Sequence, residues 1–171
     1  MNKVEIMNKK VPFVSEVEEF NRIFSKPNNY KPTIPADKTL TDFVVNFIKE
    51  ETEELEQAIE NKDIVGVLDG ICDLLYVAVG NATMVFGLKD KLEQAYAEVQ
   101  ASNLSKVCET EELAKQTVIV RSEEQGEPCH YEEVGDYFVV YRTRDNKVMK
   151  SLNYFPPDLA QFFTEEELNK I

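Results

Sequence analysis

The chain has 171 residues, with 32 acidic against 19 basic side chains and a formal net charge of −13. This length suits one domain with a full hydrophobic core and makes two domains less expected. The acidic balance argues against binding a nucleic acid polymer, because neutralising its phosphates needs clustered Lys and Arg side chains.

Along the chain the pattern predicts a mainly α fold, of the four-helix bundle type. Apolar residues at helical spacing predict a first helix over Ser15–Phe24, capped by its serine. Prolines and asparagines predict a loop over Ser25–Asp37. Two longer helices should follow as a hairpin, one starting near Thr39 or Thr41 and ending near residue 61, the other running over about 63–86. Gly87 offers this second helix a left-handed stop.

The second half of the chain changes in character. A fourth helix is expected over Asp90–Ser102, and the acidic start at Thr110 predicts another short one. The β-rich segment Tyr137–Tyr141, a turn and Val148–Lys150 predict a small C-terminal β-hairpin. A last helical turn is expected over Thr164–Leu168, capped by its threonine. We expect a single domain, with a helical core over about 14–106 and the later elements appended over about 107–171.

The sequence also predicts a location. The first ten residues carry no apolar run, so neither a signal peptide nor an anchor is expected. The apolar stretch Ile64–Leu88 is long enough for a membrane span, but it contains Asp69 and Asp73, which favours a buried helix of a soluble bundle and no membrane contact. The three cysteines show no zinc-ligand or disulfide spacing, which fits a reducing cytoplasm.

The glutamate-rich helix around residue 50 contains two populations of side chains. A run of glutamates is usually a solvated helix face, and this explains Glu53 and Glu56. Glu51, in contrast, falls within the apolar stripe of the same helix, with Glu54 at its edge and Glu50 just beyond. A carboxylate that faces a core is costly unless a cation or a hydrogen-bond donor meets it.

The next helix supplies two further carboxylates. Asp69 and Asp73 are the only charged side chains between Ile64 and Leu88, and they stand one turn apart on one face. A lone buried Asp is more often a structural hydrogen-bond partner. Here two aspartates lie opposite three glutamates of the preceding helix, and this arrangement favours a cation site. No basic residue lies on the inward faces of this hairpin, so we expect a divalent cation there.

The all-oxygen donor set selects Mg²⁺, or alternatively Mn²⁺, over Zn²⁺. The single histidine, His130, is not in a ligand pattern. Magnesium held by carboxylates suits phosphoryl or pyrophosphoryl chemistry, since the metal screens phosphate charge and a glutamate can deprotonate an attacking water.

The two acidic segments together resemble a known family. Glu50–Glu54 matches the E-E-x-x-E signature of the all-α nucleoside triphosphate pyrophosphohydrolases, the MazG-like superfamily that includes phosphoribosyl-ATP pyrophosphohydrolase, and Asp69–Tyr76 is similar to the D-L-L-Y-like segment that follows it. Val99–Lys106 and the tail over 145–159 are similar to the phage and bacterial branch of phosphoribosyl-ATP pyrophosphohydrolase-like proteins. The resemblance spans about 14–163.

This resemblance implies an activity and a set of metal ligands. It implies Mg²⁺-dependent hydrolysis of a nucleoside triphosphate between its α and β phosphates, to a monophosphate and pyrophosphate. Glu51, Glu54 and Asp73 would be metal ligands, and Glu50 would bind a second metal or, with Glu54, act on the water. Where the family commonly has a glutamate this chain has Gly70, so we expect Asp69, one residue earlier, to substitute as a ligand.

The resemblance implies substrate contacts less specifically. Asn103, Lys106 and Lys150 are candidates for phosphate or sugar binding, and Tyr76 for stacking on a base. Each has an ordinary alternative, namely a helix cap for Asn103, a solvated surface group for a lysine and simple packing for Tyr76.

Two other functions stay open at this point. One is a helical module that binds a nucleotide or a protein and keeps a relic metal site, which Gly70 favours. The other is hydrolysis of a different pyrophosphate bond, as in phosphoribosyl-ATP. In either case the thin hairpin is expected to self-associate into a homodimer or homotetramer.

Overall fold

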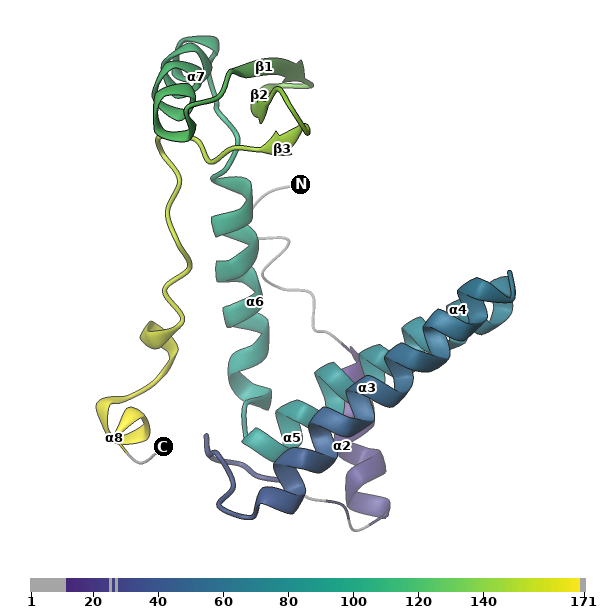
Figure 1. Ribbon diagram of the computed structural model, residues 1–171. Coiled ribbons are helices and arrows are strands. Elements are labelled where there is room, and N and C mark those ends of the chain that lie inside the picture. Colours follow the sequence, from purple (N-terminus) through teal and green to yellow (C-terminus); the bar gives the residue numbers. More distant parts are fainter. Residues whose placement is uncertain (1–11, 25, 27, 170–171) are drawn as a thin grey trace. The chain divides into compact units, whose positions relative to one another are not determined.

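The computed structural model describes residues 12–24, 26 and 28–169 (Figure 1). The chain is mainly helical and carries a small antiparallel sheet towards its C-terminus, as predicted. It divides into two compact units, residues 1–94 with 161–171 and residues 95–160, and each is described by itself. The expectation of one domain stays a prediction, and the expectation for the first ten residues lies outside the described ones.

The first unit begins with five helical elements. They are α2 (Pro12–Ile23), α3 (Lys38–Glu60), α4 (Ile64–Leu74), the π-helix η1 (Leu75–Asn81) and α5 (Ala82–Phe86). The carboxylate of Asp37 caps α3 by accepting from the Thr39 amide at 2.9 Å. Gly87 ends α5 with a φ of 65°, the left-handed conformation that the sequence predicts for it.

Helices α3 and α4 form the predicted hairpin, and glycines let them approach closely. The turn between them contains Lys62 at a φ of 57°, followed by Asp63, whose carboxylate accepts from the amides of Val65 and Gly66 at 3.1 Å each. A Cβ added to Gly70 would lie 3.1 Å from the Leu55 Cβ on α3. The backbone of α4 therefore lies directly against α3 at this position.

Helix α2 packs against η1 in the same way. A Cβ on Gly80 would overlap the side chain of Val17, so only glycine permits this contact. Val17 and Val77 are buried here. The helix starts at Pro12, and the predicted N-cap at Ser15 is wrong, because proline suits the first helical turn and lets the helix begin earlier.

The predicted burial of the third helix is wrong for its first half. Ile64, Leu68, Ile71 and Leu75 are 78, 64, 45 and 41% exposed, because α3 covers only the opposite face of α4. By length and composition alone, the continuous helix Ile64–Phe86 could cross a membrane, and 17% of the tested window is buried. Such a match is weak evidence, since apolar helices of soluble proteins pass the same test.

The second unit is a small α/β module. It contains most of α6 (Lys89–Leu104), which starts in the first unit, and then α7 (Glu111–Gln125), β1 (Cys129–Val134), β2 (Tyr137–Arg142) and β3 (Lys147–Val148). The strands pair antiparallel in the order β1-β2-β3, and α7 contacts β1 and β2. A core of Cys108, Ala114, Val140 and Met149 lies between helix and sheet.

The end of the chain returns to the first unit. The 3₁₀ turn η2 (Ala160–Phe162) precedes α8 (Glu165–Leu168), which Thr164 caps as predicted. The Thr164 hydroxyl accepts from the Glu167 amide at 3.2 Å, and the Glu167 carboxylate accepts from the Thr164 amide at 2.8 Å. Lys91 donates to the carbonyl of Phe162 at 2.6 Å and to the Glu167 carboxylate at 3.2 Å. These bonds fix α8 near the start of α6.

Candidate active site

The five predicted carboxylates of the hairpin lie on facing helices. Glu50, Glu51 and Glu54 come from α3, and Asp69 and Asp73 come from α4. Glu51 and Asp73 are half-buried, whereas the other three are exposed. Glu54, which the sequence places at the edge of the apolar stripe, is exposed in the single chain, because this side of the hairpin has no further element over it in the described part of the unit. We call these five residues the carboxylate row.

The pKa of Glu51 shows that the five carboxylates of the row lie close to one another. The pKa of the Glu51 carboxyl is raised above its usual value of 4.5, first by burial and then by the negative charges of Asp73, Glu54, Glu50 and Asp69. All four neighbours are thus close enough to act on one carboxyl. Glu53 and Glu56, predicted to face solvent, are exposed.

The row has no compensating positive charge of its own. Within residues 12–24, 26 and 28–169, none of the five carboxylates makes an ion pair or a side-chain hydrogen bond. Clustered carboxylates without partners repel each other, and a bound cation relieves that repulsion. This is the electrostatic condition that a divalent-cation site requires.

The row is not a closed cage for a metal ion. Among the described residues, no three Asp, Glu, His or Cys side chains converge on a point that could hold a metal. Three of the five side chains are exposed and can rotate, so the donors fit a hard cation by chemistry and proximity. The assignment of individual ligands stays a prediction.

Gly70 has a structural role in this chain. It is buried, and the added Cβ described above would point at Leu55 of α3, with the Leu55 Cα at 3.2 Å. Asp69, in contrast, is exposed and contributes to the field at Glu51. Position 70 thus serves helix contact, which is consistent with Asp69 acting in the row.

Tyr76 lies one turn beyond Asp73, at the start of η1. Its ring meets the ring of Phe20 edge to face, with centroids 5.6 Å apart. Burial and the charge of Glu16 raise the pKa of the Tyr76 hydroxyl above 10.0. Tyr76 therefore packs against α2, and Phe20 is a neighbour that the sequence did not single out.

The other predicted substrate contacts lie in the second unit. Lys106 Nζ donates to Asn103 Oδ1 at 2.7 Å, and Lys150 Nζ lies 4.2 Å from the centroid of the Tyr154 ring. A hydrogen bond with Ser102 holds the pKa of Tyr154 below its usual value, and the charges of Lys150 and Lys106 lower it further. Both lysines therefore act on Tyr154, a residue that the sequence analysis did not name as a site residue. Its position four residues after Lys150 in the tail was the signal that could have identified it.

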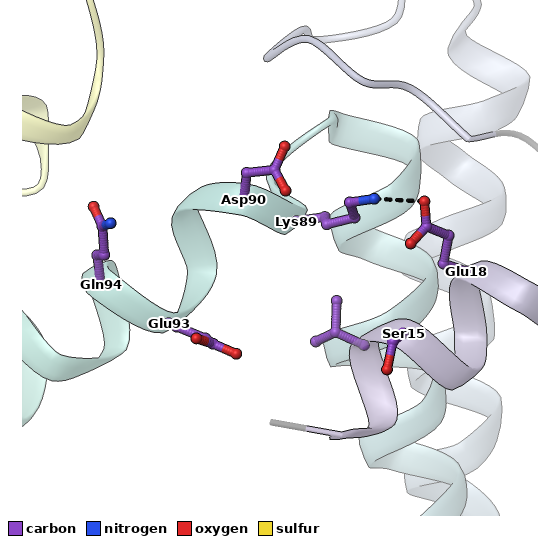
Figure 2. A pocket seen from close by; sticks show the side chains of 7 residues that line it. Ser15, Glu18, Lys89, Asp90, Glu93 and Gln94 are labelled. Atoms are coloured by element: carbon purple, nitrogen blue, oxygen red, sulfur yellow. Dashed lines mark hydrogen bonds and ion pairs between the residues drawn. The ribbon is translucent and has the colours of Figure 1, made fainter. Parts of the chain in front are cut away.

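A separate cavity of about 260 Å³ lies between α2 and the start of α6 (Figure 2). Lys89 Nζ donates to Glu18 Oε1 at 2.5 Å beside it, as the dashed line marks. None of the predicted site residues lines this cavity, so it adds nothing to the carboxylate row. Its lining residues are Val14, Ser15, Glu18, Lys89, Asp90, Glu93 and Gln94.

Comparison with known protein families gives one match. A family model described as phosphoribosyl-ATP pyrophosphohydrolase matches residues 17–103. The matched segment contains α3, α4 and η1, and with them the whole carboxylate row and Tyr76. Among proteins of curated function, none matches the chain significantly.

Proposed function

The chain belongs to the phosphoribosyl-ATP pyrophosphohydrolase family of the all-α nucleoside triphosphate pyrophosphohydrolase superfamily, and we propose that its substrate is a nucleoside triphosphate. Membership implies a hydrolase that acts on an acid anhydride bond of a nucleotide. The proposed reaction cleaves the bond between the α and β phosphates and gives a monophosphate and pyrophosphate. The observation that carries this proposal is the unpaired carboxylate row on α3 and α4.

The same row is the proposed metal site. Glu51, Glu54 and Asp73 would hold Mg²⁺, or Mn²⁺, with Asp69 and Glu50 as further ligands. When bound, the ion screens the phosphate charge and polarises the phosphorus that is attacked. The raised pKa of Glu51 supports this assignment, because a cation among these carboxylates favours their charged forms.

The exposed glutamates of the row are the proposed proton acceptors. Glu50 and Glu54 are solvent-accessible on α3, so a water can reach either carboxylate. We assign one of them to accept the proton of that water as its oxygen attacks the α phosphorus, while pyrophosphate leaves with the bridging oxygen. Asn103, Lys106 and Lys150 are proposed substrate contacts.

A panel of nucleoside and deoxynucleoside triphosphates with Mg²⁺ tests this function. We expect release of pyrophosphate and a monophosphate from at least one of them. Orthophosphate without pyrophosphate would contradict cleavage between the α and β phosphates. Phosphoribosyl-ATP belongs in the same panel, and exclusive turnover of that compound would replace the proposed substrate class.

A second candidate is a nucleotide- or protein-binding module with a relic site. It is favoured by Gly70 and by the lack of three converging ligands among the described residues. Thermal unfolding with and without millimolar Mg²⁺ separates the two functions. The enzyme is stabilised by a bound ion, whereas a relic shows no shift in melting temperature.

We also propose that the chain forms a homodimer or homotetramer. The exposed residues Ile64, Leu68, Ile71 and Leu75 follow each other at intervals of four, three and four residues, which is the seam of a helix pair. A second copy can place the same seam against this one, so the contact is self-complementary. A single-chain mass in light scattering would contradict it.

A further inference from the structure

An aromatic surface lies at the end of α2. The rings of Phe20 and Phe24 have centroids 4.4 Å apart and planes inclined by 31°. They are 38% and 58% exposed, and Phe20 meets Tyr76 edge to face. Phe20, Phe24 and Tyr76 thus form one continuous cluster with open area, which we call the aromatic platform.

The platform is held in place by backbone packing. Val17 lies one turn before Phe20 on α2 and fits against Gly80 of η1, where no side chain is tolerated. Tyr76 precedes Gly80 by one turn of the same π-helix. The relative position of the Phe20 and Tyr76 rings therefore follows from the contact of α2 with η1.

The platform continues the carboxylate row. Asp69, Asp73 and Tyr76 stand at intervals of four and three residues, so they follow one face of the helix. One helical turn advances about 5.4 Å. Tyr76 is thus within the length of a nucleotide from a metal ion held by Asp73.

We propose that the aromatic platform binds the base of the nucleotide whose phosphates lie at the carboxylate row, with Phe20 and Phe24 as residues that determine affinity for the base. This inference rests on the proposed function. Every nucleobase has a π face, and stacking on aromatic side chains tolerates any base. The site therefore favours nucleotides over inorganic polyphosphates, with little preference among the bases from stacking alone.

Calorimetry on the full chain with Mg²⁺ tests the platform. The ligands are an α,β-imido nucleoside triphosphate, which cannot be cleaved between these phosphates, and inorganic tripolyphosphate. In the double variant Phe20→Leu, Phe24→Leu we expect the Kd of the nucleotide to rise tenfold or more, on the order that loss of base stacking gives. The Kd of tripolyphosphate should not change. Tyr137→Leu is the control, because Tyr137 is 49% exposed in β2 of the other unit.

Three outcomes would overturn the inference. They are an unchanged nucleotide Kd, an equal loss for both ligands, and a wild-type protein that binds no nucleotide. If light scattering shows that only the double variant dissociates, a second copy covers the platform and the inference is also wrong. Pyrophosphate release is measured separately, so a wild-type protein that binds the imido nucleotide through the platform but cleaves no triphosphate contradicts the proposed function alone.

Discussion

The α3–α4 hairpin of the first unit differs from the second unit in how its acidic side chains are compensated. In the second unit several acids have basic partners, such as Asp145 with Arg142 at 2.6 Å and Glu127 with Arg144 at 2.7 Å. Arg142 lowers the pKa of Asp145 to about 2. In the α3–α4 hairpin the carboxylates act on each other, and the pKa of Glu51 is raised.

Their apolar surfaces differ as well. Cys108 and Val140 of the second unit are fully buried between α7 and the sheet, whereas Leu68 of α4 is 64% exposed. The second unit thus has a buried core between its helix and its sheet. The hairpin leaves both a negatively charged row and an apolar seam without partners in the described chain. A bound cation can compensate the charge of the row, and a second copy of the chain can cover the seam.

The largest effect should come from neutralising one carboxylate of the row. Glu54→Gln keeps the size of the side chain but removes a proposed ligand and proton acceptor, so we expect pyrophosphate release to fall by about 100-fold or more. Stabilisation by Mg²⁺ should be lost in the same variant. Steady-state assays and thermal unfolding measure both.

The matched control is Glu53→Gln, on the adjacent residue of the same helix, which is exposed and outside the set that acts on Glu51. It changes the net charge equally and should leave both readouts unchanged. Equal losses in the two variants would mean that only the total charge of α3 matters.

The apolar seam gives the next prediction. Leu68→Asp places a charge at the middle of the proposed interface, and burying an unpaired carboxylate there is costly. We expect the protein to become a single chain of 19.6 kDa in light scattering. Leu152→Asp, at a residue 39% exposed in the second unit, should keep the mass of the wild type. A wild-type protein that is itself monomeric would contradict the proposed contact.

The contact of α3 with α4 at Gly70 predicts a change in stability. Gly70→Glu puts a side chain against Leu55 and forces the helices apart, so urea unfolding should show a loss of about 1–3 kcal/mol. It should not increase turnover, because the new carboxylate points at α3. Asp69→Glu restores the family residue type without this clash, and its stability should stay close to that of the wild type. A Gly70→Glu variant that is both stable and more active would assign position 70 to the metal site.

The helices and the placement of the carboxylate row on α3 and α4 could be predicted largely from local pattern. Apolar spacing, caps such as Thr110 and Thr164, and the stop at Gly87 depend on neighbouring residues, and the structure has them where expected. The strand β1 was missed, although the two-residue turn Gly135-Asp136 before Tyr137 is a hairpin signal.

Local sequence pattern could not predict which apolar side chains are exposed. The amphipathic stripe of α4 predicts a buried face, but burial depends on what covers it, and within the described chain α3 covers only the side of Gly70 and Gly66. The aromatic platform was missed for the same reason. Phe20 and Tyr76 are far apart in sequence, and the fit of Val17 on Gly80 brings them together.

The smallest expected effect is the pH dependence of stability, measured without metal. The folded-state pKa of Glu51 is raised above 4.5, so the folded state binds more protons than the unfolded state just above that pH. Stability should therefore fall as the pH rises from about 4.5 through the folded-state pKa of Glu51. Asp145 has the opposite sign, because its pKa of about 2 gives stability that is lost as the pH falls below 3.8.

Urea unfolding across this pH range separates the two groups. Glu51→Gln should remove the decline above pH 4.5 and leave the protein more stable at neutral pH than the wild type, whereas Asp145→Asn should change only the acidic side. Addition of Mg²⁺ should reverse the order at neutral pH, because the ion stabilises a charged row that the glutamine variant lacks. If the wild type shows no decline and Mg²⁺ has no effect, the carboxylates of α3 and α4 do not form a common site, and the contrast between the two units is one of packing only.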